Sequence, residues 1–389
     1  MMKMDNQRMK TYTWEEYFMM MLFLSTSGTM YYFYYFSPGV AYMVFFLFVL
    51  LRFIYYKNRM KYVGSYPIVF AVIVFLNITI FNTDTIDRNG IGTILAAIAS
   101  YFFFLSFDFY RFRALYLKVL SIITACSIIV YFLSEVGWIH FQTIIIGGRS
   151  EMMWYIFHLG WNYPFHRMAS LWHEPGACMI FLNIAFLLYL SDIRQHTLHK
   201  SDAIRLGIIA LGILCTQSTT GYIAFVLILV YCFLRRKDFF SCKGIVLLAL
   251  LVLFFAIIYN SDVIQSKFAQ DEEGVTSKGI RLRDNLACLQ MAIEHPFTGC
   301  GFGTKTFARY SNMLDNATSS NGILRTAACV GIYFIPLYLL FAFYSIRRWN
   351  KSFIQSLVIL VIFTILESNE AYMELPISYI FLARYRNMI

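Results

Sequence analysis

Long apolar segments, separated by short polar ones, follow one another along almost the whole chain. Segments of this kind are long enough for a helix to cross roughly 30 Å of hydrocarbon. Their approximate bounds are 17–36, 38–56, 66–82, 91–107, 115–136, 175–190, 204–217, 220–234, 244–260, 321–346, 352–367 and 369–383. The pattern predicts an all-α polytopic membrane protein with roughly twelve transmembrane helices, in which residues 1–389 form a single integral membrane domain.

Two longer polar stretches interrupt this pattern, at residues 137–174 and 261–320. In the second stretch, Leu282, Leu286 and Ile293 recur at helical spacing, which predicts a helix that lies on the membrane surface with its apolar side down. We expect both stretches to be long extracytoplasmic loops that contain short interfacial helices.

The composition supports a membrane protein. Hydrophobic residues make up 59% of the 389 residues, charged residues make up 14%, and the mean hydropathy is +0.61. A soluble globular chain carries about 25% charged residues, so no soluble domain of any size remains. Residues 1–16 are polar and precede an apolar segment with no small-residue cleavage site, which indicates an uncleaved N-terminus and not a signal peptide.

Lysine and arginine residues gather after every second apolar segment. The groups lie within 52–61, 111–118, 194–205, 235–243, 347–351 and 384–386. Because positive residues favour the cytoplasmic side, this pattern predicts that both termini are cytoplasmic and that both long loops lie outside. The net charge of +10 could suggest nucleic acid, but the basic residues punctuate hydrophobic segments, so we predict no nucleic-acid partner.

The eight cysteines show no CxxC spacing. Most lie in or beside apolar segments, where cysteine behaves as a small hydrophobe. Cys288 and Cys300 both fall in the second loop, so a disulfide between them stays an option.

Several arginines lie where the positive-inside rule does not require them. Arg149 and Arg167 belong to the first loop, Arg281 and Arg283 belong to the second, and Arg325 begins the next helix. A guanidinium group matches phosphate geometry and keeps its charge at any relevant pH. These arginines are therefore candidates for binding an anionic substrate, although solvated surface charge would explain each one alone.

The stretch FHRMASLWHEPG places ionisable side chains directly before an apolar helix. Pro175 suits the first helical position, and Glu174 could simply complement the helix dipole. That interpretation does not explain why Arg167 and the histidines are also present. One of these histidines, His173, stands next to Glu174. A carboxylate, imidazoles and an arginine at the outer membrane surface can take a proton from a hydroxyl while holding an anion. His173 alone would equally suit a loop residue with a polar partner.

The second loop also contains HPFTGCGFG, in which glycine recurs at every second position. Gly299, Gly301 and Gly303 allow a tight turn or a close approach to a ligand. A dinucleotide-binding motif follows a strand and opens a helix, whereas this one follows a helix, so we do not expect nucleotide binding. His295 is a second candidate for a general base, or else it closes the helix before Pro296. The sequence has no DxD, HExxH or Walker A motif, which disfavours a metal-dependent or nucleotide-dependent reaction.

The order of these motifs is familiar. They are Arg167 with Glu174-Pro175-Gly176, the hairpin TQSTTGY at 216–222, Arg281 with Arg283, HPFTGCGFG at 295–303, and SSNGILRTAACVGIYF at 319–334. In this order they resemble the O-antigen polymerase and O-antigen ligase superfamily. The resemblance covers about residues 140–345.

The resemblance implies a metal-independent, inverting glycosyl transfer at the outer leaflet of a bacterial cytoplasmic (inner) membrane, with no cofactor. The donor would be an undecaprenyl-diphosphate-linked oligosaccharide, and the partners would be membrane lipid, a chain-length regulator and a flippase. The implied roles fall on three groups of residues. The diphosphate would contact Arg167, Arg281, Arg283, Arg325 and Arg149; the rest of the substrate would contact His173, Gly301, Gly303 and Asn321; the general base would be Glu174 or His295.

Two alternatives to a polymerase remain. Ligases of this superfamily, which transfer the glycan to a lipid A core, typically carry a histidine immediately before the asparagine that opens the late helix. Here Asn321 and Gly331 fit that frame but Ser320 precedes Asn321, which favours a polymerase of O-antigen, capsule or exopolysaccharide. A flippase or other transporter would place ionisable residues near the bilayer midplane and often shows repeated halves, whereas this chain concentrates such residues in two loops and shows no repeat.

Overall fold

The computed structural model describes residues 12–30, 38–56, 66–83, 88–146, 149–162, 165–195, 197–234, 277–302, 307, 319–372, 375–383 and 385. The predicted span 244–260 and much of the loop 261–320 lie outside these residues. The described part is mostly helical, as the hydrophobic pattern predicts, although a count of about twelve spans is not confirmed.

The helices follow one another in the order expected from the apolar segments. They are α2 (Trp14–Ser25), α4 (Pro38–Tyr56), α5 (Tyr66–Leu76) with the π-helical turn η2 (Asn77–Phe81), α6 (Arg88–Leu105), α7 (Phe109–Glu135), α8 (Pro175–Gln195), α9 (Lys200–Thr216), α10 (Thr219–Leu234), α13 (Ser277–Glu294), α15 (Gly322–Val330), α16 (Phe334–Trp349) and α17 (Phe353–Glu367). Several begin at a side-chain cap. Thr13 and Glu16 form a capping box on α2, and Asp108 and Ser352 cap α7 and α17.

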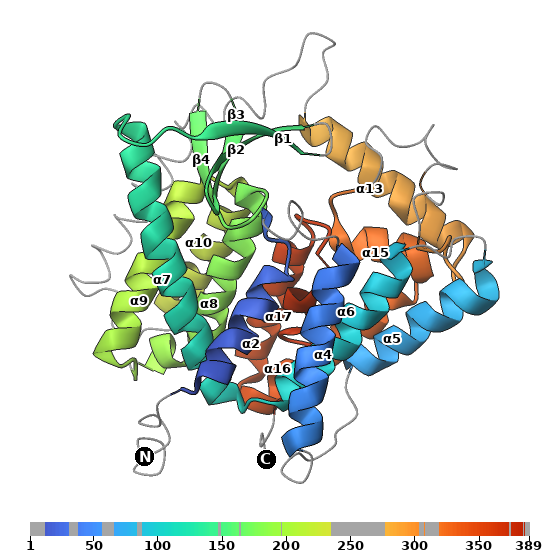
Figure 1. The fold of residues 1–389 in the computed structure, drawn as a ribbon. Helices are drawn as coiled ribbons and strands as arrows, with labels where there is room; N and C mark the ends of the chain where they lie inside the picture. The colour runs from blue at the N-terminus through green and yellow to red at the C-terminus, as the bar shows by residue number, and fades with distance from the viewer. Residues whose placement is uncertain are drawn as a thin grey trace.

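Helix α8 is enclosed by other helices: it packs against α7, α9 and α10, which stand beside it in Figure 1, and against α17. Every residue from Pro175 to Leu190 is buried, as expected of a helix that is apolar all round. Peripheral helices instead expose large apolar side chains, such as Leu47, Leu51 and Ile54 on α4. Among the described residues, α7 and α8 are long and apolar enough to cross a membrane, and several shorter apolar helices accompany them.

The first long loop holds a sheet, so the expectation of short interfacial helices was wrong for its described residues. Strands β1 (Gln142–Ile146), β2 (Arg149–Trp154), β3 (Phe157–Asn162) and β4 (Phe165–Ser170) form an antiparallel meander in the order β1-β2-β3-β4. The physical reason is that these short segments are rich in β-branched and aromatic side chains, which favour strands. Buried Leu159 and Met168 pair across β3 and β4, whereas buried Met153 pairs with His158 on the other face. Strand β4 packs on α7, α8 and α9.

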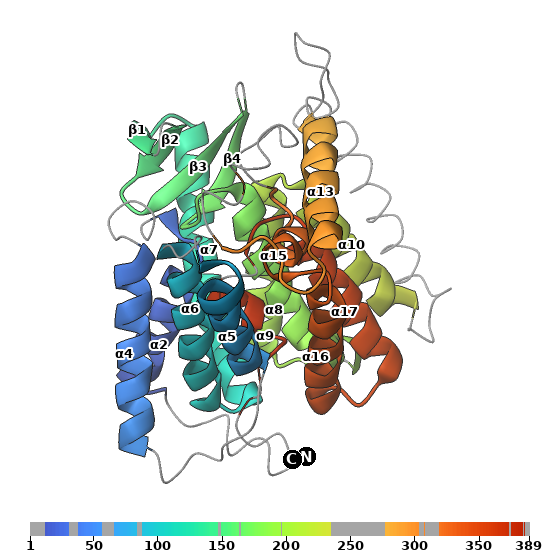
Figure 2. The ribbon, with the colours of Figure 1, turned by 90° about the vertical axis from the view of Figure 1, so that its right-hand side faces the viewer.

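The sheet and α13 lie at the same end of the helix bundle, which we call the sheet end (Figures 1 and 2). The helix expected around Leu282 is confirmed as α13, but its contact with α15 uses another face. That face carries small or flexible side chains, including Ala287, Cys288 and Met291, which are buried, whereas Leu282 and Ile293 are exposed. Cys288 and Cys300 are both buried free thiols, so the optional disulfide is not formed.

The opposite end of the bundle, which we call the far end, is held by ion pairs between helix termini. Arg52 of α4 lies 2.6 Å from Glu15 of α2, and Arg113 of α7 lies 2.6 Å from Asp192 of α8. The partners are largely buried, so each pair couples two helices that are distant in sequence. These are basic residues of the groups that follow every second apolar segment.

The predicted helix 321–346 is broken, so a single continuous span there was wrong. Helix α15 ends at Val330, and Gly331 has a φ of 114° before α16 begins. A Cβ atom on Gly331 would lie 2.5 Å from the carbonyl oxygen of Pro296. The chain after α13 presses against this break, where the amides of Cys300 and Gly301 donate to the carbonyls of Ala328 and Cys329 at 2.9 and 3.0 Å.

Replacing Gly299 by alanine should therefore destabilise the fold by more than about 2 kcal/mol. Its φ is 58°, and an added Cβ would overlap the backbone carbonyl of Cys329, which cannot move aside cheaply. Thermal unfolding of the purified protein would measure the effect. Gly207→Ala is the matched control, because that Cβ meets nothing within 4 Å in helix α9 and should stabilise the protein slightly. Equal melting temperatures for Gly299→Ala and the wild type would contradict this account.

The segment that was predicted as a helix at 369–383 is not helical, apart from the short 3-10 turn η5 (Pro376–Tyr379). After α17 the chain turns at the sheet end through Ser368 to Tyr372, and residues 375–383 then run back through the bundle towards the far end, where Tyr385 packs against Phe109 at the start of α7. The described residues 375–383 are all buried. Irregular backbone at membrane depth is tolerated where protein surrounds it, and local bonds such as Ala383 to Tyr379 O at 2.8 Å satisfy its amides.

Candidate active site

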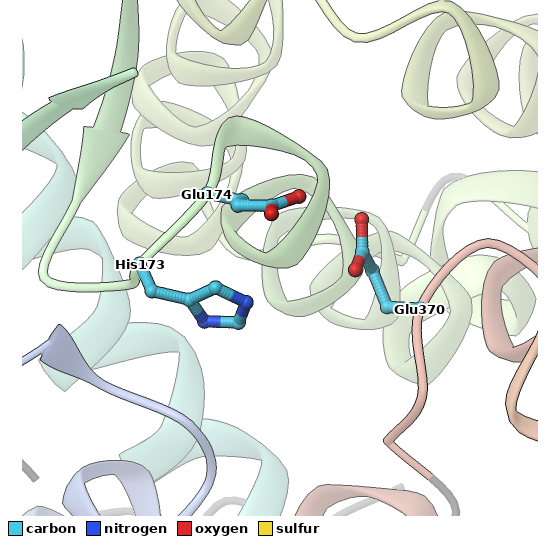
Figure 3. A group of neighbouring side chains, drawn as sticks. All are labelled: His173, Glu174 and Glu370. Carbon is cyan, nitrogen blue, oxygen red and sulfur yellow. The ribbon is translucent and has the colours of Figure 1, made fainter. Parts of the chain in front are cut away.

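Three ionisable side chains meet at the sheet end, where β4, the start of α8 and the turn after α17 come together (Figure 3). They are His173, Glu174 and Glu370. One nitrogen or oxygen atom from each lies within 4.8 Å of those of the other two. Glu370 is only 7% exposed, whereas His173 and Glu174 are half-buried.

The local sequence explains why Glu174 points into this junction. Strand β4 ends at Ser170, whose φ of 60° turns the chain sharply, and buried Trp172 forms an isolated bridge with Thr29. Helix α8 begins at Pro175, as the sequence predicts, so Glu174 occupies the position just before the helix, and its carbonyl accepts from the amide of Cys178 at 3.0 Å.

Hydrogen-bond contacts hold the His173 ring in place. Its Nδ1 lies 3.3 Å from the carbonyl oxygen of Gly28 and 3.2 Å from the hydroxyl of Tyr372. With a proton on Nδ1 the ring donates to the Gly28 carbonyl, and without one Nδ1 accepts from the Tyr372 hydroxyl.

Glu370 favours its protonated form. Burial raises the pKa of Glu370 well above its usual range, and the neighbouring Glu174 carboxylate raises it further. The positive charges of Arg281 and Arg167 oppose this shift without cancelling it. A side-chain hydrogen bond joins the two carboxyl groups, which requires a proton on one of them.

Arg167 reaches the same cluster from strand β4. Its Nε donates to the carbonyl oxygen of Thr216 at 3.2 Å, which fixes the guanidinium group between the sheet and the α9–α10 hairpin. Burial lowers the pKa of Arg167, but a guanidinium group starts so high that it keeps its charge. The charges of Glu174, Glu370 and Arg281 all act on it.

Arg281 approaches from the first turns of α13 and is exposed. Its charge acts on both Glu370 and Arg167. The structure thus brings Arg167, His173, Glu174 and Arg281 together from the two long loops.

The remaining residues of the predicted site lie elsewhere or outside the described part. The guanidinium carbon of Arg325 lies 5.8 Å from the ring centroid of Phe307, and the Asn321 side chain accepts from the amide of Leu324 as the cap of α15. Arg283 is exposed on α13, and His295 is exposed just after α13. The amide of Gly301 donates to the carbonyl oxygen of Cys329. Arg149 lies in β2, but its side chain is outside the described part of the chain, as is the whole of Gly303. Their substrate contacts stay predictions.

The spacing of His173, Glu174 and Glu370 is short enough for a metal ion to bridge them. Two arginine charges, however, act on the same carboxylates and already compensate them. A divalent cation would have to bind beside those guanidinium groups at a high electrostatic cost. The arrangement therefore favours a shared proton over a cation.

Glu370 was not identified as a site residue from the sequence, because Glu370 lies in a segment whose hydropathy predicts a membrane span. The polar triplet Ser368-Asn369-Glu370 was the available signal, since a carboxylate in an apolar segment marks a functional site by default. The hairpin TQSTTGY supports this triplet, because Thr220 Oγ1 donates to Asn369 Oδ1 at 2.6 Å.

Fold and site together define a helical membrane protein with an acid–base cluster and two arginines at one end of its bundle. Residues 205–327 match the family model of the O-antigen ligases. The expected resemblance to the O-antigen polymerase and ligase superfamily is thereby confirmed over these residues, which include Arg281. The family comprises glycosyltransferase-like membrane enzymes that act on lipid-linked oligosaccharides, and the match does not distinguish a polymerase from a ligase. No curated protein matches the chain.

Proposed function

We propose that the protein polymerises undecaprenyl-diphosphate-linked oligosaccharide repeat units at the outer leaflet of the bacterial cytoplasmic membrane. The observation that carries this proposal is the convergence of Glu174, Arg167 and Arg281 at the sheet end. A glycosyl transfer from a diphosphate needs a proton acceptor and positive charge at the leaving group, and these residues supply both.

The proposed reaction is a single displacement. An acceptor hydroxyl attacks the anomeric carbon, the bond from that carbon to the diphosphate oxygen breaks, and the electron pair leaves with the diphosphate. Glu174 takes the proton of the hydroxyl, while Arg167 and Arg281 stabilise the growing negative charge. One displacement inverts the anomeric configuration.

Glu174 is a better candidate for the base than His295. His295 follows the last residue of α13, whereas Arg281 lies in its first turns. At 1.5 Å of rise per residue these positions are roughly 20 Å apart along the helix, too far to serve one reacting bond. A base beside the arginines can instead act on the same sugar whose diphosphate they hold.

Polymer synthesis should continue undiminished in excess EDTA. The reason is that arginines, and not a cation, are proposed to compensate both the carboxylates and the diphosphate. Purified protein with a lipid-linked donor, followed by gel analysis of the product, would measure this. Loss of synthesis that is restored by Mg²⁺ or Mn²⁺ would contradict the proposal.

The proposed topology is multi-pass in the inner membrane, with both termini cytoplasmic and the sheet end outside. It is supported by the basic residues at the far end, among them Arg52 and Arg113. A flippase that delivers the repeat units and a chain-length regulator are the proposed partners.

A deletion strain separates this function from its alternatives. Surface polysaccharide from the strain, run beside the wild type, should show single repeat units on an otherwise capped acceptor. Full-length polymer that stays on its lipid carrier would indicate a ligase. Lipid-linked repeat units that remain on the cytoplasmic leaflet would indicate a transporter.

A further inference from the structure

Glu370 is fixed in place by close packing on more than one side. A Cβ atom on Gly176 would overlap its Oε1, so the start of α8 touches the carboxyl group directly. Asn369 Nδ2 donates to the same Oε1 at 3.1 Å, and Asn369 is itself held by Thr220 at 2.6 Å. At 7% exposure the carboxyl group of Glu370 cannot turn into solvent without displacing these contacts.

Charged groups face Glu370 from each element that packs around it. His173 and Glu174 approach from the turn before α8, Arg167 from β4 and Arg281 from α13. The hydroxyl group of Tyr372 belongs to the same turn as Glu370. Two ionised carboxylates this close together would repel strongly in a buried site. One proton between them removes the repulsion, and the more buried partner, Glu370, is the one that keeps it.

We infer that Glu370 is the proton-holding partner of Glu174, donating a hydrogen bond that aims the Glu174 carboxylate at the acceptor hydroxyl. This role rests on the proposed function and deepens it. Glu370 is a positioning residue, since it acts through Glu174 and does not touch the reacting atoms. When Glu174 takes the proton of the acceptor, Glu370 retains its own, so the pair passes from one proton to two and returns to one when Glu174 releases its proton to water.

Two substitutions of Glu370 distinguish a proton donor from a bare carboxylate. Glu370→Gln keeps the shape and offers an N–H donor, so it should lose far less activity than Glu370→Ala. Glu370→Ala leaves Glu174 without its hydrogen bond and should slow transfer by about tenfold or more. Turnover of the purified full-length variants with a lipid-linked donor would measure both. If Glu370→Gln were as inactive as Glu174→Gln, an ionised Glu370 would be required, as a base or as a cation ligand, and the inference would fall.

The pH profile separates this role from a merely structural one. Because the pKa of Glu370 is raised, its proton persists above the pH at which an ordinary glutamate ionises and is lost as the pH rises through the raised pKa. Wild-type turnover should therefore decline on the alkaline side, whereas Glu370→Gln, which has no such proton to lose, should decline at higher pH. Identical alkaline limbs for the two proteins would overturn the inference.

Infrared spectroscopy tests the pair without relying on turnover. In a difference spectrum of wild type minus Glu370→Gln, the C=O band of a protonated carboxyl group should appear at pH values where ordinary glutamates have ionised. The buried carboxyl group of Glu367 is present in both proteins and cancels in the difference. Absence of the difference band would refute the pair even if transfer proceeds, whereas a wild type that gives the difference band but transfers no sugar would refute the proposed function.

Discussion

Replacing Arg167 or Arg281 by alanine should abolish polymer formation while the protein stays abundant in the membrane. Both guanidinium groups act on the carboxylate pair, and both are placed to stabilise the departing diphosphate. Removing one donor that stabilises developing charge costs about 100-fold or more in rate. Polysaccharide chain length in cells, and turnover of purified protein, would measure the loss.

Control variants separate this effect from unfolding and from bulk charge. Arg281 is exposed, so its removal should leave melting temperature unchanged, and Arg348→Ala in the exposed last turn of α16 removes the same charge far from the site. Arg281→Lys should also fail, because lysine cannot make the paired bonds of a guanidinium group. Full-length polymer from both Arg167→Ala and Arg281→Ala would show that the site is wrong.

Replacing Glu174 by glutamine should slow transfer by about 100-fold to 10,000-fold, the range expected when a general base is lost. Glutamine keeps the shape and the helix start at Pro175, so the protein should fold normally. Turnover with the lipid-linked donor is the measurement. Glu294→Gln is the matched control, since Glu294 is exposed at the end of α13 and bonds only to Gln290 among the contacts described for its side chain.

His295→Ala in the same assay decides between the two candidate bases. Transfer that survives in His295→Ala and fails in Glu174→Gln supports the proposed assignment. The reverse result would identify His295, just after α13, as the general base and would show that the carboxylate pair takes no part in the reaction.

Local signals in the sequence predicted much of the fold. The Glu174-Pro175 pair located the start of α8, and the periodic leucines located α13. The hairpin TQSTTGY appears where expected, because Gln217 takes a left-handed φ of 46° between α9 and α10. Each of these features depends on side chains within a few residues of one another, which is the information that a single sequence holds.

The features that were missed depend on contacts between distant segments. The break at Gly331 lies against the carbonyl oxygen of Pro296, and nothing in the sequence around either residue indicates that the two are in contact. Hydropathy does not distinguish a transmembrane helix from buried irregular backbone. Residues 369–383 were therefore predicted as a span, and Glu370 was not considered as a site residue because it lies within that span. The sheet was missed because its short strands lack a clean alternation: the adjacent apolar residues Met152 and Met153 of β2 lie on opposite faces.

The irregular return of the chain after α17 has a consequence for how the protein is made. A translocation channel releases segments into lipid one helix at a time, but residues 375–383 have no continuous helix to satisfy their amides there. We expect them to settle only into a bundle whose preceding helices have already assembled. Since Glu370 stands just before this segment, the carboxylate pair would be completed only at that late step. A ribosome-bound intermediate that ends before Glu370 should therefore be inserted in the membrane yet inactive.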